Sequence, residues 1–393
     1  MSEEIEIHSC CSSSLPAAAD SPIDNDDLLR EILLRLPSLP SSLPRASAVC
    51  KRWRRLVANP RFLRSFRDHH RKEGPPILGF FEDDSVDLVF HPILDPPDSV
   101  PLRIDINFRC FSVLGCRHGR LLIIDTESEI WQLFVCTPVT GEQQRVPIPT
   151  DFKIGSFIGS VMCAASDLGH VHGACHSSHF KAVLVATYGE DGQTIARVYS
   201  SETGTWGNLI STPSPYLDFS FGSPGCLVGK SLYWLSMDHT ILELNLEEKN
   251  LAMVSVPPCA NNVTNHQIIL AVDAAVGFAA LSYPCLQMWQ RNVNCHGAAA
   301  WVPWKTIQVH TILGLPPQTE SARRQMEYIL CYDEDTDTIF ISVDANIYMV
   351  QIKSLQSKRL YRTNYVFRIY PFKSFYPPGT RITGGGAEMV HDR

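Results

Sequence analysis

The sequence has no long apolar run and no excess of basic charge. Its apolar segments, such as Leu121 to Ile124 and Ile268 to Val272, are the length of strands. A membrane-spanning helix needs roughly 20 such residues. The formal net charge is −7 over 393 residues, so overall charge favours neither nucleic acid nor an anionic membrane. We therefore expect no nucleic-acid partner and no membrane partner.

The start of the chain lacks the pattern of a secretory signal. Residues 1–21 open with acids and continue with Ser and Ala, whereas a signal peptide has a basic start and an apolar run of about 7–15 residues. We expect a disordered N-terminal tail over 1–21 and a cytoplasmic and/or nuclear protein. The 13 cysteines are odd in number and scattered, and a reducing compartment favours buried thiols over disulfides.

Motifs for nucleotide or acyl chemistry are also missing. Gly229-Lys230-Ser231 lacks the preceding glycine of a phosphate-binding loop, and the chain has no Gly-x-Ser-x-Gly elbow. The acids Asp333, Glu334, Asp335 and Asp337 lack the glycine and terminal glutamate of a calcium-binding EF-hand loop. We interpret those acids as a hairpin turn, and we expect no catalytic residue and no cofactor.

One segment is rich in potential zinc ligands: Cys163, His170, His172, Cys175, His176 and His179. Zinc sites use four thiolate or imidazole ligands held close together. The segment has no Cys-x-x-Cys pair, and its spacing follows no zinc-module template. The sequence therefore favours a loop between strands, available to a protein target, and predicts no metal.

The first ordered part of the chain has helical periodicity. Asp24 to Asp27 offer capping oxygens and negative charge at a helix N-terminus. Leu28, Leu29, Ile32, Leu33 and Leu36 then form one apolar face on a 3.6-residue period. Pro37 and Pro40 end this helix.

A second helix is predicted after Ser42, with an apolar side from Leu43 to Val57 and a basic opposite side. Asn59-Pro60 breaks it, and a short third helix follows. The Lys and Arg residues between Arg45 and Lys72 fit a solvated helix face better than a nucleic-acid site. Three short helices cannot bury all of these leucines among themselves, so we predict a surface for a partner helix.

Two sequence blocks within these helices resemble an F-box. The first runs Asp27-Leu28-Leu29-Arg30-Glu31-Ile32-Leu33-Leu34-Arg35-Leu36-Pro37, and the second runs Val49-Cys50-Lys51-Arg52-Trp53-Arg54-Arg55-Leu56. The resemblance implies binding to a Skp-type adaptor, and through it to a cullin scaffold and a ubiquitin-conjugating enzyme. It places the adaptor contacts on Leu28, Leu29, Ile32, Leu36, Pro37, Val49, Cys50, Trp53 and Leu56. Leu29 and Trp53 are the favoured contacts.

After Gly74-Pro75-Pro76, short apolar segments alternate with turn clusters, which is typical of an all-β fold. Similar units recur, marked by Gly141, Gly204, Lys249, Trp304 and Lys358. Their period is slightly longer than the roughly 40–50 residues of a propeller blade. We predict a β-propeller of about six blades, in which strands from residues 77–111 are joined by the C-terminal residues 365–370. A β-sandwich or an irregular barrel remains an alternative.

The units resemble the kelch-like, F-box-associated propellers of plant F-box proteins, although the paired glycines of a regular kelch blade are missing. The predicted organisation is an α+β multidomain chain. A three-helix F-box spans 22–73, an all-β propeller spans 77–376, and a flexible tail spans 377–393. The implied function is the substrate-recognition adaptor of a Skp–cullin–F-box ubiquitin ligase, with an unknown target protein. The alternatives are a propeller-fold enzyme, such as a hydrolase or oxidase, and an F-box scaffold outside a ligase.

Overall fold

A computed structural model describes most of the chain from Asn25 to Phe375. The described ranges are 25–83, 87–104, 110–127, 131–152, 156–165, 170–176, 178–188, 192–219, 224–258, 265–294, 296, 298–316, 327–362 and 368–375. The predicted tails, 1–21 and 377–393, lie outside these residues.

Four helices form the N-terminal module: α1 (Asp26–Leu34), α2 (Ser42–Val49), α3 (Lys51–Val57) and α4 (Pro60–His69). Asn25 caps α1, because its side chain accepts hydrogen bonds from the backbone N–H groups of Asp27 and Leu28. Asn59 caps α4 in the same way, with Pro60 in the first turn. The helices pack around a small core of Leu29, Leu33, Leu43, Ala46, Val57, Phe62 and Phe66.

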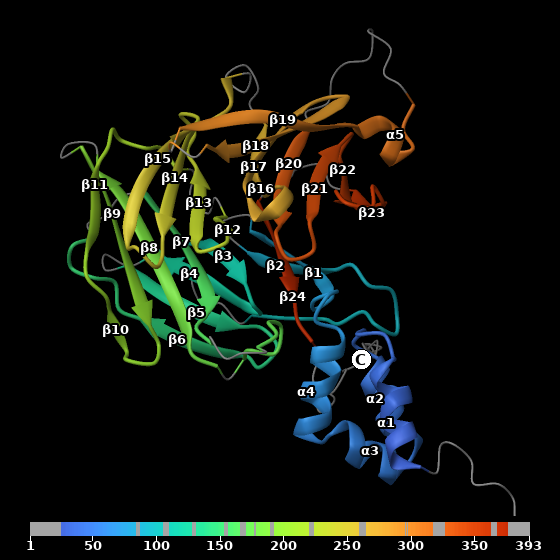
Figure 1. Cartoon of the computed structure of the whole chain (residues 1–393). Coiled ribbons are helices and arrows are strands. Elements are labelled where there is room, and N and C mark those ends of the chain that lie inside the picture. Colours follow the sequence, from blue (N-terminus) through green and yellow to red (C-terminus); the bar gives the residue numbers. More distant parts are fainter. Residues whose placement is uncertain are drawn as a thin grey trace, which may run out of the picture.

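The prediction of three helices is wrong in one place. The stretch from Ser42 to Val57 is two helices, α2 and α3, because Cys50 has an extended backbone with φ −161° and ψ 171°. The break redirects the chain between the two helices. Figure 1 shows α1 to α4 as a separate group of blue helices beside the ring of strands.

The rest of the described chain folds into six antiparallel sheets, which confirms the predicted six-bladed propeller. The first two blades are β24 (Arg368–Lys373), β1 (Ile77–Asp83) and β2 (Leu88–Pro92), and then β3 (Phe111–Arg117), β4 (Arg120–Asp125), β5 (Gln132–Thr137) and β6 (Glu142–Val146). The third is β7 (Ser156–Cys163), β8 (Phe180–Tyr188), β9 (Gln193–Ser200), β10 (Thr205–Trp206) and β11 (Ile210–Pro213).

The other three blades each have four strands. They are β12 (Cys226–Val228), β13 (Ser231–Leu235), β14 (Thr240–Asn245) and β15 (Asn250–Ser255); β16 (His266–Leu270), β17 (Val276–Ser282), β18 (Cys285–Val293) and β19 (Ala299–Gln308); and β20 (Tyr328–Asp333), β21 (Thr338–Val343), β22 (Asn346–Gln351) and β23 (Ser357–Arg362). A one-turn 3-10 helix, η3 (Val272–Ala274), precedes β17, and the short helix α5 (Val309–Leu313) follows β19.

The ring closes by pairing the two ends of the propeller. β24 pairs antiparallel with β1, so that Phe81 faces Tyr370 across the two strands. β24 also contacts β3 on one side and β20 on the other, which makes it the inner strand of the first blade (Figure 1). The predicted closure by the C-terminal segment is thus confirmed. Closure protects the edges that an open sheet would expose.

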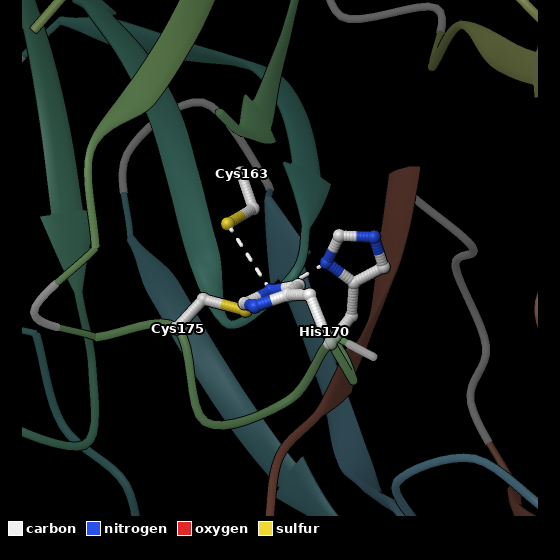
Figure 2. Close-up of side chains that lie close together, drawn as sticks. Cys163, His170 and Cys175 are labelled. Carbon is white, nitrogen blue, oxygen red and sulfur yellow. Dashed lines mark hydrogen bonds between the residues drawn. The ribbon is translucent and has the colours of Figure 1, made fainter. Parts of the chain in front are cut away.

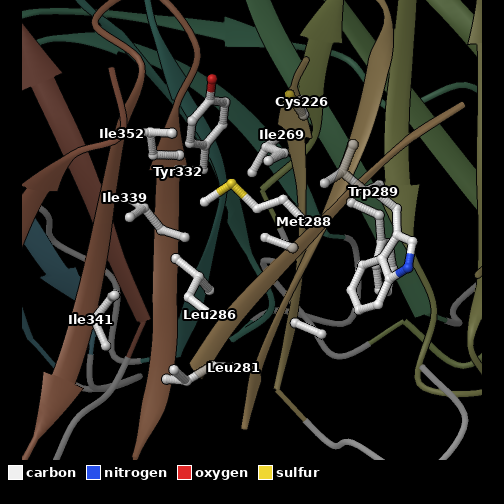
Figure 3. Packing of buried hydrophobic residues seen from close by; sticks show 14 of the residues in the cluster. Cys226, Ile269, Leu281, Leu286, Met288, Trp289, Tyr332, Ile339, Ile341 and Ile352 are labelled. Atoms are coloured by element: carbon white, nitrogen blue, oxygen red, sulfur yellow. The ribbon is translucent and has the colours of Figure 1, made fainter. Parts of the chain in front are cut away.

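Apolar side chains fill the spaces between neighbouring blades. The largest cluster joins the last three blades, with Cys226, Ile269, Met288 and Ile339 fully or nearly fully buried (Figure 3). Comparable clusters lie between the other neighbouring blades. A buried side chain of this size stabilises the fold by about 1.5–3 kcal/mol, so these clusters hold neighbouring blades together. No helix in the described part of the chain is long and apolar enough to cross a membrane.

Candidate functional site: the helical docking surface and two clusters in the propeller

The helical module exposes several of the apolar side chains predicted to contact a partner. Leu28 is 49% exposed, Ile32 43% and Val49 61%. Leu28 and Ile32 lie one turn apart on α1 and therefore share a face. Exposed leucine and isoleucine on one helix face form the kind of surface that a partner helix covers.

The other predicted contacts differ in exposure. Pro37 and Cys50 are exposed, whereas Leu36, Trp53 and Leu56 are half-buried against the small helical core. Trp53 therefore has one part in the core and another part accessible to a partner. Whether these side chains contact an adaptor stays a prediction.

Leu29 is an exception among the predicted contacts. Its side chain is fully buried in the core of the helical module. We therefore assign it to folding, and its burial disfavours the predicted contact between Leu29 and an adaptor. The 3.6-residue period places Leu28 and Leu29 on neighbouring parts of one broad apolar stripe. Only the positions of α2 to α4 decide which of the two is covered.

A buried ion-pair network lies where the inner strands of several blades approach each other. Arg117, the last residue of β3, contacts Glu334 at 2.5 Å and donates to the Ser160 hydroxyl on β7 at 2.5 Å. It also donates to the carbonyl oxygen of Gly225, just before β12, at 2.9 Å. Lys373, the last residue of β24, pairs with Asp333 and with Asp335. These contacts connect five of the six blades.

The charges in this network stabilise each other. Burial alone would lower the pKa of Arg117, but Glu334 raises it above the usual value. Burial alone would raise the pKa of Asp335, but Lys373 and His118 lower it to about 2. For Glu334 burial has the larger effect and raises the pKa, although Arg117 acts against it. The network joins the blades, and each of its acids has a cationic partner.

This network bears on two predictions. Glu334, Asp335 and Asp337 do lie in the turn between β20 and β21, as predicted, and Asp333 is the last residue of β20. The enzyme alternative requires inward-facing carboxylates from several blades, but here the acids come from one turn and pair with Arg117 and Lys373. Sequence reasoning missed Arg117 and Lys373 altogether. The only sequence feature that could have indicated them is that each is a charged residue at the end of an apolar strand.

The second cluster is the segment rich in Cys and His. Of its six predicted members, Cys163, His170, His172 and Cys175 come together, with one ligand atom of each within 4.8 Å of the others. Figure 2 shows the sulfur atoms of Cys163 and Cys175 on either side of the His170 ring. His176 contacts Ser374 instead, with 3.2 Å between Nε2 and Oγ, and His179 is exposed. The hydrogen bond from Cys175 lowers the pKa of the Cys163 thiol.

The segment that carries this cluster also lies between the helical module and the propeller. The carbonyl oxygen of Gly173 accepts hydrogen bonds from the backbone N–H of Phe375 at 2.8 Å and from the Ser374 hydroxyl at 3.0 Å. Ala174 and His176 line a cavity of about 150 Å³ together with Leu39, Leu43 and Phe66 of the helical module. Residues 170–176 therefore form part of the junction between the two domains, which we call the junction loop.

Two family models match the chain. The model described as "F-box domain" matches residues 25–65. The model described as "F-box protein AT5G49610-like, beta-propeller" matches residues 112–379, more than half of the 393 residues. The chain belongs to this family of F-box β-propeller proteins. This membership agrees with the order of the four helices and six blades along the chain.

Curated relatives of this F-box protein come from Arabidopsis thaliana. "F-box/kelch-repeat protein At3g61590" is 27% identical over 190 residues, which cover 47% of this chain and 45% of the relative. "F-box/LRR-repeat/kelch-repeat protein At2g27520" is 23% identical, covering 59% and 60%. "Putative F-box protein At3g16210" is 24% identical, covering 61% and 62%. The chain thus spans about half to three-fifths of the length of these relatives.

Solved structures show only a distant likeness. A putative 6-phosphogluconolactonase from Bacteroides fragilis is 12% identical with a TM-score of 0.36, covering 64% of this chain and 67% of that one. A loop-replaced variant of KlHsv2 is 10% identical with a TM-score of 0.35, covering 56% and 66%. These values are too low to carry an argument about function.

Proposed function

We propose that this F-box protein is the substrate-recognition adaptor of a Skp–cullin–F-box ubiquitin ligase. In this proposal the helical module binds a Skp-type adaptor, which connects it to the cullin scaffold. The observation that carries the proposal is the exposure of Leu28, Ile32 and Val49 on an F-box whose own core is complete without them. Covering an apolar side chain of this size with a partner contributes about 1.5–3 kcal/mol when its burial is complete.

The propeller then serves as the platform for a target protein. Its closed ring and interblade packing hold together the strands from which the loops extend. A rigid platform raises the local concentration of target lysines near the conjugating enzyme without chemistry of its own. We propose, accordingly, that the chain is not itself an enzyme, and that it acts in the cytosol and/or nucleus. Expression of a fluorescent fusion would test the location.

The adaptor interaction is tested by co-purification of the full chain with a Skp-type adaptor. Ile32→Asp introduces a charge into the exposed part of the α1 face. We expect the affinity to fall about 30-fold or more, which corresponds to the loss of a hot spot worth about 2 kcal/mol. Because Ile32 is 43% exposed, the substitution should leave the fold intact.

Val302→Asp is the matched control, because Val302 is a β-branched residue of similar exposure, 44%, on β19 of the propeller. It should bind the adaptor as the unaltered chain does. Equal adaptor binding by Ile32→Asp and the unaltered chain would refute the docking proposal. Leu29→Asp is unsuitable, because a charge at this fully buried position would unfold the module.

Target recognition is tested by proximity labelling with the proteasome blocked. Proteins labelled by the unaltered chain, and stabilised by the block, are candidate targets. With Ile32→Asp the same proteins should be labelled but no longer accumulate ubiquitin. Labelled proteins that carry no ubiquitin in either case would instead favour the scaffold alternative.

A further inference from the structure

The side chains of Cys163, His170, His172 and Cys175 have the arrangement of metal ligands. The Nε2 atom of His170 lies 3.4 Å from the sulfur of Cys163 and 3.2 Å from the sulfur of Cys175. The Nδ1 atom of His172 lies 3.7 Å from the sulfur of Cys175. All four ligand atoms lie within 4.8 Å of one another.

These separations match a zinc tetrahedron. Zinc binds thiolate sulfur at about 2.3 Å and imidazole nitrogen at about 2.0–2.1 Å, so adjacent sulfur and nitrogen ligands lie about 3.6 Å apart. The three sulfur–nitrogen separations in the cluster, 3.4, 3.2 and 3.7 Å, are close to this value. Two sulfur and two imidazole ligands in a tetrahedron select zinc over the harder cations Mg²⁺ and Ca²⁺.

The fold itself holds the two cysteines in place. Cys163 ends β7, and the next residue, Ala164, donates its backbone N–H to the carbonyl of His179 at 2.8 Å, just before β8. Cys175 is fully buried. Arg120, also buried, donates to the backbone carbonyls of Cys175 and Ser178, the latter at 2.6 Å. The ligands at both ends of the segment are therefore positioned by strands and by a buried guanidinium.

Further side chains surround the ligands as they do in metal sites. His118 accepts a hydrogen bond from the backbone N–H of Cys163 at 3.0 Å, and its ring stacks on that of His172 with centroids 3.6 Å apart. The backbone N–H of Ala165 donates to the Cys163 sulfur at 3.4 Å. Such outer contacts orient ligands and support the charge on a thiolate.

We propose that Cys163, His170, His172 and Cys175 form a structural Zn²⁺ site that fixes the junction loop between the F-box and the propeller. The four ligands fill a tetrahedron and leave no open position for water or substrate, which is the property of structural zinc sites. The site replaces the earlier expectation that this segment binds no metal. It does not depend on the proposed ligase function, since metal content is measured on the chain alone.

Metal binding has a consequence for the junction. His170, His172 and Cys175 belong to the junction loop, which contacts Ser374 and Phe375 of the propeller and lines the cavity beside Leu43 and Phe66 of the F-box. Zinc therefore links the end of β7 to the surface on which the helical module rests. Loss of the metal frees this loop and loosens the orientation of the F-box relative to the blades.

The test is the zinc content of the full chain, purified without a polyhistidine tag and measured by elemental mass spectrometry. We expect about one zinc per chain, falling to about a tenth or less in Cys175→Ser and in His170→Ala, since losing a direct ligand costs more than the 10–100-fold affinity loss of outer contacts. His179→Ala, in the same segment but exposed, and Cys285→Ser, on a different blade, are matched controls that should keep the metal.

Three further measurements guard against variants that fail to fold. His172→Cys keeps four ligands and should retain zinc. The unaltered chain, stripped with a chelator and reloaded with Co²⁺, should show the intense visible bands of a tetrahedral site and a thiolate charge-transfer band. In hydrogen exchange, the stripped chain should lose protection in residues 170–176 and recover it when zinc is added.

Three results would overturn the proposal. The first is an unaltered chain that neither contains zinc nor takes up stoichiometric zinc after reduction. The second is zinc that persists in the Cys163→Ser/Cys175→Ser double variant, because the metal would then lie elsewhere. The third is a disulfide between Cys163 and Cys175 in protein purified under reducing conditions, because oxidised sulfur does not ligate zinc as a thiolate does.

Discussion

The F-box and the propeller bury their apolar side chains in different ways. The helical module keeps a small core and leaves Leu28, Ile32 and Val49 in solvent. The propeller covers its strands with neighbouring blades and buries even charged groups such as Arg117 and Lys373. The comparison shows which region leaves apolar surface open to a partner and which region is covered by its own chain.

The largest expected effect tests how far the propeller depends on its buried charges. Arg117→Met removes the cation that pairs with Glu334 and bridges to Ser160. Removing one partner of a buried pair typically destabilises a protein by about 3–5 kcal/mol. We expect a decrease of this size in the free energy of unfolding of the propeller, measured with urea. A loss below about 1 kcal/mol would mean that the blades hold together without the network.

The next effect separates core from docking surface within one helix. Leu29→Ala should destabilise the F-box by about 2–5 kcal/mol, because it leaves a cavity in a small core. Leu28→Ala, at the adjacent but exposed position, should change stability by about 0.5 kcal/mol or less and weaken adaptor binding. Thermal unfolding and adaptor affinity of both variants provide the measurements. Equal stability losses in the two variants would contradict the assignment.

A smaller effect concerns acid sensitivity of the propeller. The folded-state pKa of Asp335 is about 2, below the roughly 3.9 of an unfolded aspartate. Its ionised form therefore stabilises the fold above about pH 4, and this contribution is lost as the pH falls from about 4 to about 2. In Asp335→Asn the stability should be lower at neutral pH and should fall less over that interval. Urea unfolding at a series of pH values gives the free energy of unfolding of both proteins. If it fell equally with pH in Asp335→Asn and in the unaltered chain, the predicted role of Asp335 would be refuted.

The smallest effect is expected for an ion pair outside both the core and the network. Lys230 and Glu247 are 2.6 Å apart, but both side chains are more than half exposed. Lys230→Met should change the free energy of unfolding by about 0.5 kcal/mol or less, because solvent screens such pairs. It is the matched control for Arg117→Met. A similar loss in both variants would show that burial is not what distinguishes the two pairs.

Much of the architecture was predictable because it follows local patterns. The apolar stripe and caps predicted α1, and Asn59-Pro60 predicted the boundary before α4. Gly141, Gly204 and Lys249 were recognisable as blade markers because they occupy equivalent turns, all with positive φ. The break at Cys50 was not predictable, since the apolar period continues through it. Neither was the ion pair between Arg117 and Glu334, which are 217 residues apart.

By itself, the sequence determined the two domains, the F-box blocks and the repeated strands, because these depend on periodicity and turn residues within short segments. The tertiary structure decided which leucine of the stripe is buried, which charges pair at the centre of the ring, and which cysteines and histidines meet. Those outcomes depend on how β24 closes onto β1 and how the helices pack against one another. No local pattern contains this information, because each contact joins residues that the chain brings together only when it is folded.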